Sequence, residues 1–164
     1  MKKKYFQAIS LFAIIFSSVQ YQTQAQFPLG TTEHFDSTFP PTGWATFTGA
    51  NGLGTVQEWQ NTENTAHVAY EDVSGGLAQD WLVTPQFIPS PESWLTWQQK
   101  KSYEMNYGSV YKVFISTGSQ TNIADFTLVQ TQVEADLNLV YRWKHLDLAE
   151  YIGVPIYVAF VLEQ

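Results

Sequence analysis

Short stretches in which apolar and polar residues alternate follow one another along most of the chain. In residues 94–100, Trp94, Thr96 and Gln98 fall on one face and Leu95, Trp97 and Gln99 on the other. Tyr111, Val113 and Ile115 share one side of the stretch 107–117. A period of two residues is typical of β-strands. Residues 156–162 are apolar on both faces, which predicts a central strand.

Further short strands are predicted between turn signals. Candidates are 67–70, 126–133, 141–148 and small strands within 44–59 that Gly49, Gly52 and Gly54 interrupt. Pro85 breaks the stretch 80–87, which predicts an edge or bulged strand there. Residues 122–126 and 148–152 each suit a single helical turn. Strands at intervals of roughly ten residues indicate an all-β domain, a sandwich or a jelly roll.

The first 25 residues have the pattern of a secretory signal peptide. Lys2, Lys3 and Lys4 precede an apolar run over 8–19, and the segment ends at Thr23-Gln24-Ala25. The run is shorter than the ~20 residues that span a bilayer. We therefore expect cleavage after Ala25, a mature domain of residues 26–164, and a secreted or cell-surface location without membrane insertion.

Composition narrows the partners of this domain. Removal of the three leading lysines leaves five basic residues against fifteen acidic ones, so the net charge moves from −7 to −10. A nucleic-acid ligand is excluded because five basic residues are too few to form the positively charged surface that binds phosphates. The chain has no cysteine, which excludes disulfides and thiolate sites. The expected partners are a glycan, a host or surface protein, or a cation.

The last apolar stretch runs almost to the final residue, Gln164. A sheet partner for that strand would be expected to follow it. We therefore predict that the natural protein continues and that the domain in residues 26–164 lacks its last strand.

A series of short motifs stands in order along residues 33–164. They are FD at 35–36, PTGW at 41–44, DWLVTP at 80–85, YKVFIST at 111–117, DFT at 125–127, W at 143, LDL at 146–148, YIG at 151–153 and VAF at 158–160. Taken together, the series resembles the cleaved-adhesin or choice-of-anchor J family. That resemblance implies a MAM-like jelly-roll β-sandwich on secreted bacterial surface proteins. Some members are adhesin modules of secreted proteases.

The resemblance also implies a structural calcium ion. Calcium takes six to eight oxygen ligands. Asp36 is the first candidate, because the resemblance places an acidic residue there, and Glu33 and Asp80 are weaker ones. The alternatives are turn capping by Asp36 and a solvated charge at Glu33. The family's closing motif, similar to Trp-x-Ile-Asp-Asp, is missing, which agrees with a truncated domain.

Aromatic residues make up 16% of the chain, a high share. Trp44, Trp81 and Trp143 lie within the motifs above and are expected in the core, where aromatic side chains bury large areas. Three other aromatic residues fall in or near predicted loops, where exposed rings could stack on sugars. These ligand-binding candidates are Trp59, Tyr103 and Tyr107.

The sequence favours a binding module over an enzyme. His34, His67 and His145 lack metal-ligand spacing, and no Gly-x-Ser-x-Gly motif is present. The leading hypothesis is a non-catalytic, adhesin-like module for a glycan or host protein, stabilised by calcium. The alternatives are an accessory domain of a larger secreted protease or glycan-degrading enzyme, and a glycosidase-type hydrolase, which would need two opposed carboxylates. A structural spacer is the plainest alternative.

Overall fold

The computed structural model describes residues 29–164, so the predicted signal peptide at 1–25 lies outside the described residues. The described part contains strands and three single 3-10 turns. In chain order they are β1 (Ala45–Thr48), β2 (Gln60–Thr62), β3 (Thr65–His67), β4 (Gln79–Val83), β5 (Trp94–Gln99), β6 (Val110–Ser116), η1 (Ile123–Asp125), β7 (Phe126–Val133), η2 (Glu134–Asp136), β8 (Arg142–Asp147), η3 (Ala149–Tyr151) and β9 (Tyr157–Glu163). Among these residues no helix is long and apolar enough to cross a bilayer.

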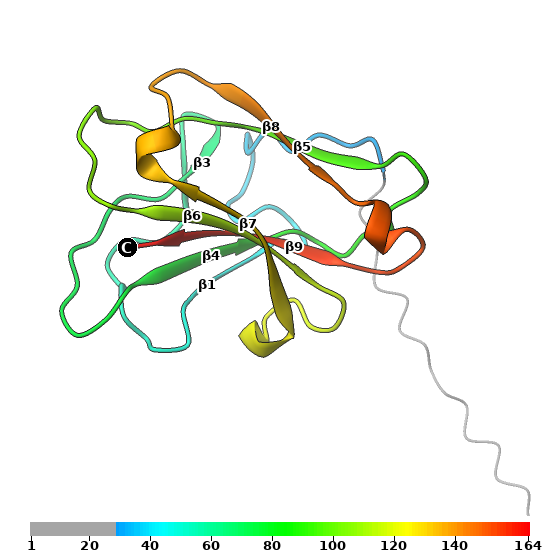
Figure 1. The fold of residues 1–164 in the computed structure, drawn as a ribbon, viewed down its shortest axis with the longest axis horizontal. Helices are drawn as coiled ribbons and strands as arrows, with labels where there is room; N and C mark the ends of the chain where they lie inside the picture. Colours follow the sequence, from blue (N-terminus) through cyan, green and yellow to red (C-terminus); the bar gives the residue numbers. More distant parts are fainter. Residues whose placement is uncertain (1–28) are drawn as a thin grey trace, which may run out of the picture.

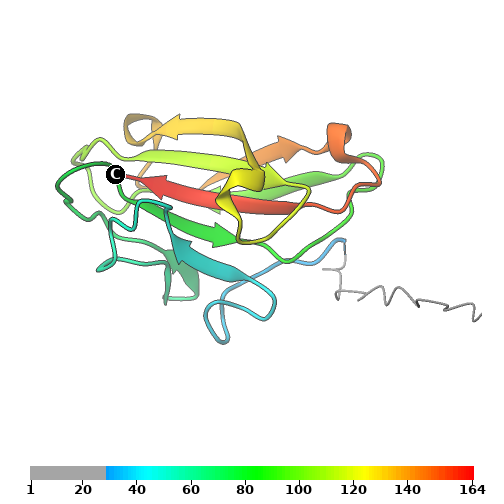
Figure 2. The same ribbon diagram turned by 90° about the horizontal axis from the view of Figure 1, so that it is seen from below.

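Five strands form the main sheet, in the order β1-β4-β9-β6-β7, and every neighbouring pair is antiparallel. Figure 2 shows this order from cyan β1 to yellow β7. β9 lies at the centre and pairs with β4 on one edge and β6 on the other. The predicted central strand is therefore confirmed. The expected need for a further partner is wrong, because both edges of β9 are already paired.

The second layer is the two-stranded ladder of β5 and β8, which runs along one side of the main sheet (Figure 1). Leu95, Trp97 and Leu146 of this ladder pack against a core cluster. The buried members of that cluster are Phe87, Val113, Ile115, Leu148, Ile156 and Val158. The all-β prediction is confirmed, and the two layers agree with a jelly-roll β-sandwich.

The opposite face of the main sheet carries a second cluster built around Trp81, which is 1% exposed. Its ring stacks on Phe47 with centroids 5.6 Å apart, and it also meets Phe114 and Phe126. Apolar residues thus cover both faces of the sheet centre. This arrangement explains why the sequence of β9 is apolar at nearly every position.

Two strand predictions need correction. β4 was expected at an edge, but it lies between β1 and β9. The strand ends at Val83, so Pro85 falls outside the ladder and its missing N–H costs no sheet hydrogen bond. The strand predicted at 67–70 is Thr65–His67, paired with β2 across Glu63 and Asn64, which both have positive φ. That backbone is typical of a tight two-residue hairpin turn.

Candidate functional site

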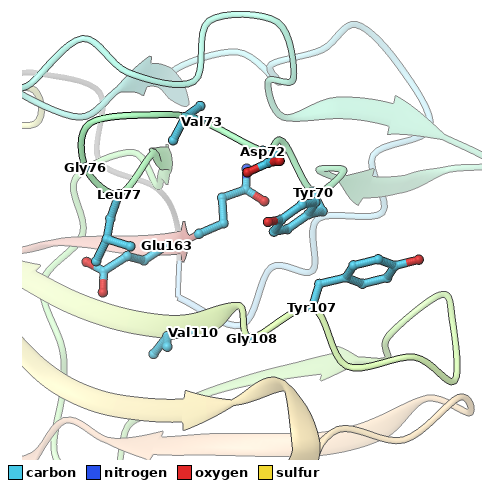
Figure 3. Close-up of a pocket in the computed structure, with 10 residues that line it drawn as sticks. Tyr70, Asp72, Val73, Gly76, Leu77, Tyr107, Gly108, Val110 and Glu163 are labelled. Carbon is cyan, nitrogen blue, oxygen red and sulfur yellow. The ribbon is translucent and has the colours of Figure 1, made fainter.

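A groove of about 260 Å³ lies where the C-terminal end of β9 meets the start of β6. Two loops form its sides, one between β3 and β4 and one between β5 and β6. Its lining consists of Tyr70, Asp72, Val73, Gly76, Leu77, Tyr107, Gly108, Val110, Glu163 and Gln164. Figure 3 shows the two tyrosines on one side of the groove, with Leu77 and Glu163 on the other.

Tyr70 and Tyr107 form the aromatic side of the groove. Their rings are stacked, with centroids 5.2 Å apart and planes 26° from parallel. The two side chains are 40% and 43% exposed, so one aromatic pair stays open to a ligand. The residues are 37 positions apart in sequence, and only the fold brings them together.

Gln164 fixes the backbone on both sides of Tyr70. Its Oε1 accepts a hydrogen bond from the Glu71 N–H at 3.0 Å, and its Nε2 donates to the Ala69 carbonyl at 3.4 Å. The Gln164 backbone in turn exchanges two hydrogen bonds with Ala78, at 2.7 and 3.0 Å. The end of β9 therefore holds Tyr70 in place through a side chain 94 residues away in sequence.

Glu134 holds Tyr107 in a similar way. This carboxylate is 6% exposed, and its Oε2 accepts hydrogen bonds from the N–H groups of Tyr107 at 2.8 Å and Ser109 at 3.3 Å. Gly108, between them, has a φ of +86°, a conformation that glycine adopts easily. The backbone that carries each ring of the aromatic pair is thus held by a buried or half-buried polar side chain.

The two carboxylates that line the groove, Glu163 and Asp72, have different surroundings. Glu163 accepts hydrogen bonds from Lys112 at 2.6 Å and from Gln79 at 2.8 Å. Desolvation pushes the pKa of Glu163 upward, but the hydrogen bonds from Lys112 and Gln79 outweigh it and hold the pKa below its usual value. Asp72 is exposed at the opening. The groove therefore has one aromatic side, the carboxylate of Glu163, which is paired with Lys112, and the solvated carboxylate of Asp72.

The structure places the three predicted ligand-binding residues in different environments. Tyr107 lines the groove. Tyr103 is 68% exposed but is not part of the lining. Trp59 is half-buried, and its Nε1 donates to the Asp80 carbonyl at 2.9 Å, so its indole N–H is already used within the fold. Tyr70 was missed, because it was the last residue of the strand predicted at 67–70 and nothing there gave a sign of the distant Tyr107.

Three tryptophans were expected in the core, and the structure confirms this for only some of them. Trp81 is buried as expected, and Trp44 is half-buried. Trp143 was expected in the core, but it is 70% exposed. Along β8 the side chains of Lys144 and Leu146 turn inward, so Trp143 must turn outward. The motif that contains it carried no information about which face was buried.

The predicted calcium ligands are not brought together as a complete set. Among residues 29–164 no three or more His, Asp or Glu side chains are grouped so that they could hold a metal ion. Asp36 is exposed, and a carboxylate oxygen of Glu33 accepts the Phe35 N–H at 2.6 Å. Glu33 therefore caps a local turn.

Asp80 fits a cation better than the other two candidates. It is 1% exposed, and its Oδ1 is buried without a hydrogen-bond partner. Its Oδ2 accepts from Gln164 Nε2 at 3.2 Å. Burial, followed by the negative charges of Glu71 and Glu58, raises the pKa of Asp80 to about 7. Among residues 29–164, this buried carboxyl with one unpartnered oxygen is the feature that favours a bound cation.

The fold has solved counterparts. The K1 and K3 cleaved adhesin domains of Lys-gingipain from Porphyromonas gingivalis each superimpose with a TM-score of 0.50, at 16% and 18% identity. Each comparison covers 75% of this chain, with 87% of the K1 domain and 88% of the K3 domain. No family model and no curated protein sequence matches the chain. The resemblance to cleaved adhesins is thus confirmed at the level of the fold.

Proposed function

We propose that this chain is a non-catalytic, adhesin-like module that acts outside the cell and binds a glycan in the groove beside Tyr70 and Tyr107. The fold it shares with two cleaved adhesin domains supports the adhesin-like part of the proposal. The observation that supports a glycan ligand is the stacked, half-exposed tyrosine pair, whose backbone is held by hydrogen bonds to Gln164 and Glu134.

A glycan suits the groove for chemical reasons. One face of a pyranose ring is lined by C–H groups and packs on an aromatic surface, while its hydroxyls need donors and acceptors. Tyrosine supplies both a ring and a hydroxyl. Because the backbone at both tyrosines is already held by hydrogen bonds, a ligand would not have to order these two loop positions, and that lowers the entropic cost of binding.

A glycan array probed with the labelled chain tests this function. Binding to at least one glycan should be lost or fall about fivefold in Tyr107→Ala, because each stacked ring contributes about 1 kcal/mol. Tyr70→Ala should behave in the same way. Tyr103→Ala is the matched control, since that ring is more exposed but lies outside the groove lining. Unchanged binding in both groove variants would contradict the proposal, as would binding to immobilised host proteins alone.

We also propose that a calcium ion stabilises the fold next to Asp80. The orphaned Oδ1 and the nearby charges of Glu58 and Glu71 support this placement. Asp36 and Glu33 stay predicted ligands for the same ion. The Tm in millimolar calcium should exceed the Tm in EDTA by several degrees, since calcium at 100 times its Kd adds ~2.7 kcal/mol to the free energy of unfolding. Asp80→Asn should abolish that difference. A melt indifferent to calcium would refute the site.

A further inference from the structure

The β5–β8 ladder turns six side chains away from the core. They are Trp94, Thr96 and Gln98 from β5 and Trp143, His145 and Asp147 from β8, and we call this surface the tryptophan face. All six are exposed. The opposite side of the same ladder holds Leu95, Trp97 and Leu146 against the core. The outward direction of the six side chains is therefore fixed by the packing behind them.

The two outward tryptophans are unusually exposed. Trp94 is 54% exposed and Trp143 is 70% exposed. Indole is the largest apolar side chain and normally contributes to a core or an interface. Exposed aromatic residues that gather on one face mark binding surfaces more often than isolated ones do. Neither residue belongs to the groove described above.

The register places the two indoles at opposite corners of the face. Trp94 lies across from Asp147, and Trp143 lies across from Gln98. Four residues of strand separate Trp94 from Gln98, which corresponds to about 13 Å. The His145 ring meets the edge of Trp94, with centroids 5.2 Å apart. A ligand that touches both indoles must therefore be extended and must lie along the strands.

The centre of the face is polar and holds no Asp, Glu, Lys or Arg side chain. Thr96, Gln98 and His145 offer hydrogen-bond donors and acceptors between the two indoles. Asp147 lies at one end, and its Oδ1 accepts the Ala149 N–H at 2.9 Å. Lys100 lies beyond the other end, with Nζ 4.9 Å from the centroid of the Tyr141 ring. This charge pattern suits an uncharged ligand, and the acidic chain as a whole disfavours a polyanion.

We propose that the tryptophan face binds a single extended chain of an uncharged polysaccharide, which lies along β5 and β8. Two sugar rings stack on Trp94 and Trp143, and hydroxyls of the sugars between them meet Thr96, Gln98 and His145. The span of about 13 Å requires several sugar units, so the ligand is a polymer or a long oligosaccharide rather than a monosaccharide. This second surface does not depend on the Tyr70–Tyr107 groove.

Affinity electrophoresis of the whole chain through hydroxyethyl cellulose, xylan and a soluble β-1,3-glucan tests the proposal, with heparin as the anionic comparison. At least one neutral polymer should retard the chain, and heparin should not. Trp94→Ala and Trp143→Ala should each weaken the retardation by about fivefold, the effect of losing one stacked ring. Hexasaccharides of the same polymer should compete and disaccharides should not. Tyr103→Ala is the control that leaves this surface and the groove lining intact.

Indole fluorescence separates this surface from the groove. The retarding polymer should protect the wild-type indoles from a collisional quencher, and that protection should vanish in the Trp94→Ala/Trp143→Ala double variant. Loss of glycan binding in Tyr107→Ala alone would concern only the groove. The proposal is overturned if no neutral polymer retards the chain or if the double variant is retarded like the wild type. It also fails if the double variant only abolishes self-association, since a second copy would then cover the face.

Discussion

Two aromatic surfaces of this chain are built in different ways. The groove tyrosines sit in loops and are held by the side chains of Gln164 and Glu134, which reach them from distant strand ends. Trp94 and Trp143 sit on a regular antiparallel ladder, which places them through its register alone. The groove can therefore be lost by removing one polar side chain, whereas the tryptophan face should survive every change that leaves the ladder and its packing intact.

The largest expected effect comes from the core that supports both surfaces. Trp81→Ala should lower the free energy of unfolding by about 3–5 kcal/mol, because it leaves a cavity among Phe47, Phe114 and Phe126. Trp143→Ala is the same chemical change on the exposed face and should cost less than ~0.5 kcal/mol. Urea denaturation measures both. Equal losses would show that Trp143 is buried in solution.

A pH titration should affect the groove side and spare the tryptophan face. The pKa of Asp80 is about 7 in the folded chain, above its ordinary value of 3.8. The folded state thus binds more protons between those values, and stability should fall as the pH rises from about 4 to about 7, by at most roughly 4 kcal/mol.

Chemical denaturation at a series of pH values in EDTA checks this slope, because calcium would favour the charged carboxylate. Asp80→Asn removes the titrating group and should flatten the profile. Since Asp80 accepts a hydrogen bond from Gln164, the position of Tyr70 should change over the same range. Trp143 fluorescence should not follow this transition. A slope that persists in Asp80→Asn would assign it to another group.

Removal of the carboxylate behind Tyr107 should weaken the groove selectively. Glu134→Ala leaves the N–H groups of Tyr107 and Ser109 without their acceptor, at a cost of about 1–3 kcal/mol. Amide exchange at these two residues should accelerate, and exchange along β5 and β8 should not. Glu134→Gln keeps an oxygen acceptor and should lie between the two. Uniform acceleration across all strands would indicate global destabilisation instead.

The smallest effect concerns the end of the tryptophan face. Lys100→Gln removes the cation over the Tyr141 ring and should cost about 0.5–1 kcal/mol or less, as expected for an exposed cation–π contact. Retardation by a neutral polysaccharide should stay within about twofold of wild type, because the central residues are unchanged. Strong loss of binding would place Lys100 in the ligand surface and argue for an anionic partner.

Local pattern predicted much of the fold. The alternation in 94–100, the strand at 126–133 and the apolar stretch at 156–162 correspond to β5, β7 and β9 with shifts of at most one residue at either end. The helical turn expected at 122–126 is η1. These features depend on neighbouring residues, so a window of a few positions contains their cause. For the site, a place near a predicted loop made Tyr107 a ligand candidate, and the structure puts it in the groove lining. Asp80 became a calcium candidate through the resemblance, and that role stays a prediction.

Other predictions failed because their cause lies elsewhere in the chain. A period of two residues shows that a strand has two different faces, but it does not show which face meets the second layer. Trp81 and Trp143 were both expected in the core because both lie within the motifs of the resemblance, although one is buried and the other is exposed. The position of β4 inside the sheet likewise depends on its partners β1 and β9, which are remote in sequence.

The sequence by itself determined the all-β class, the main strands, the acidic charge and the abundance of aromatic residues. Only the tertiary structure decided how those aromatic residues are used. It brought Tyr70 onto Tyr107, placed Gln164 behind the first ring and turned Trp94 and Trp143 to the same outer face. The reason is physical: strand formation follows local side-chain alternation, whereas a binding surface arises from contacts between segments that the sequence keeps far apart.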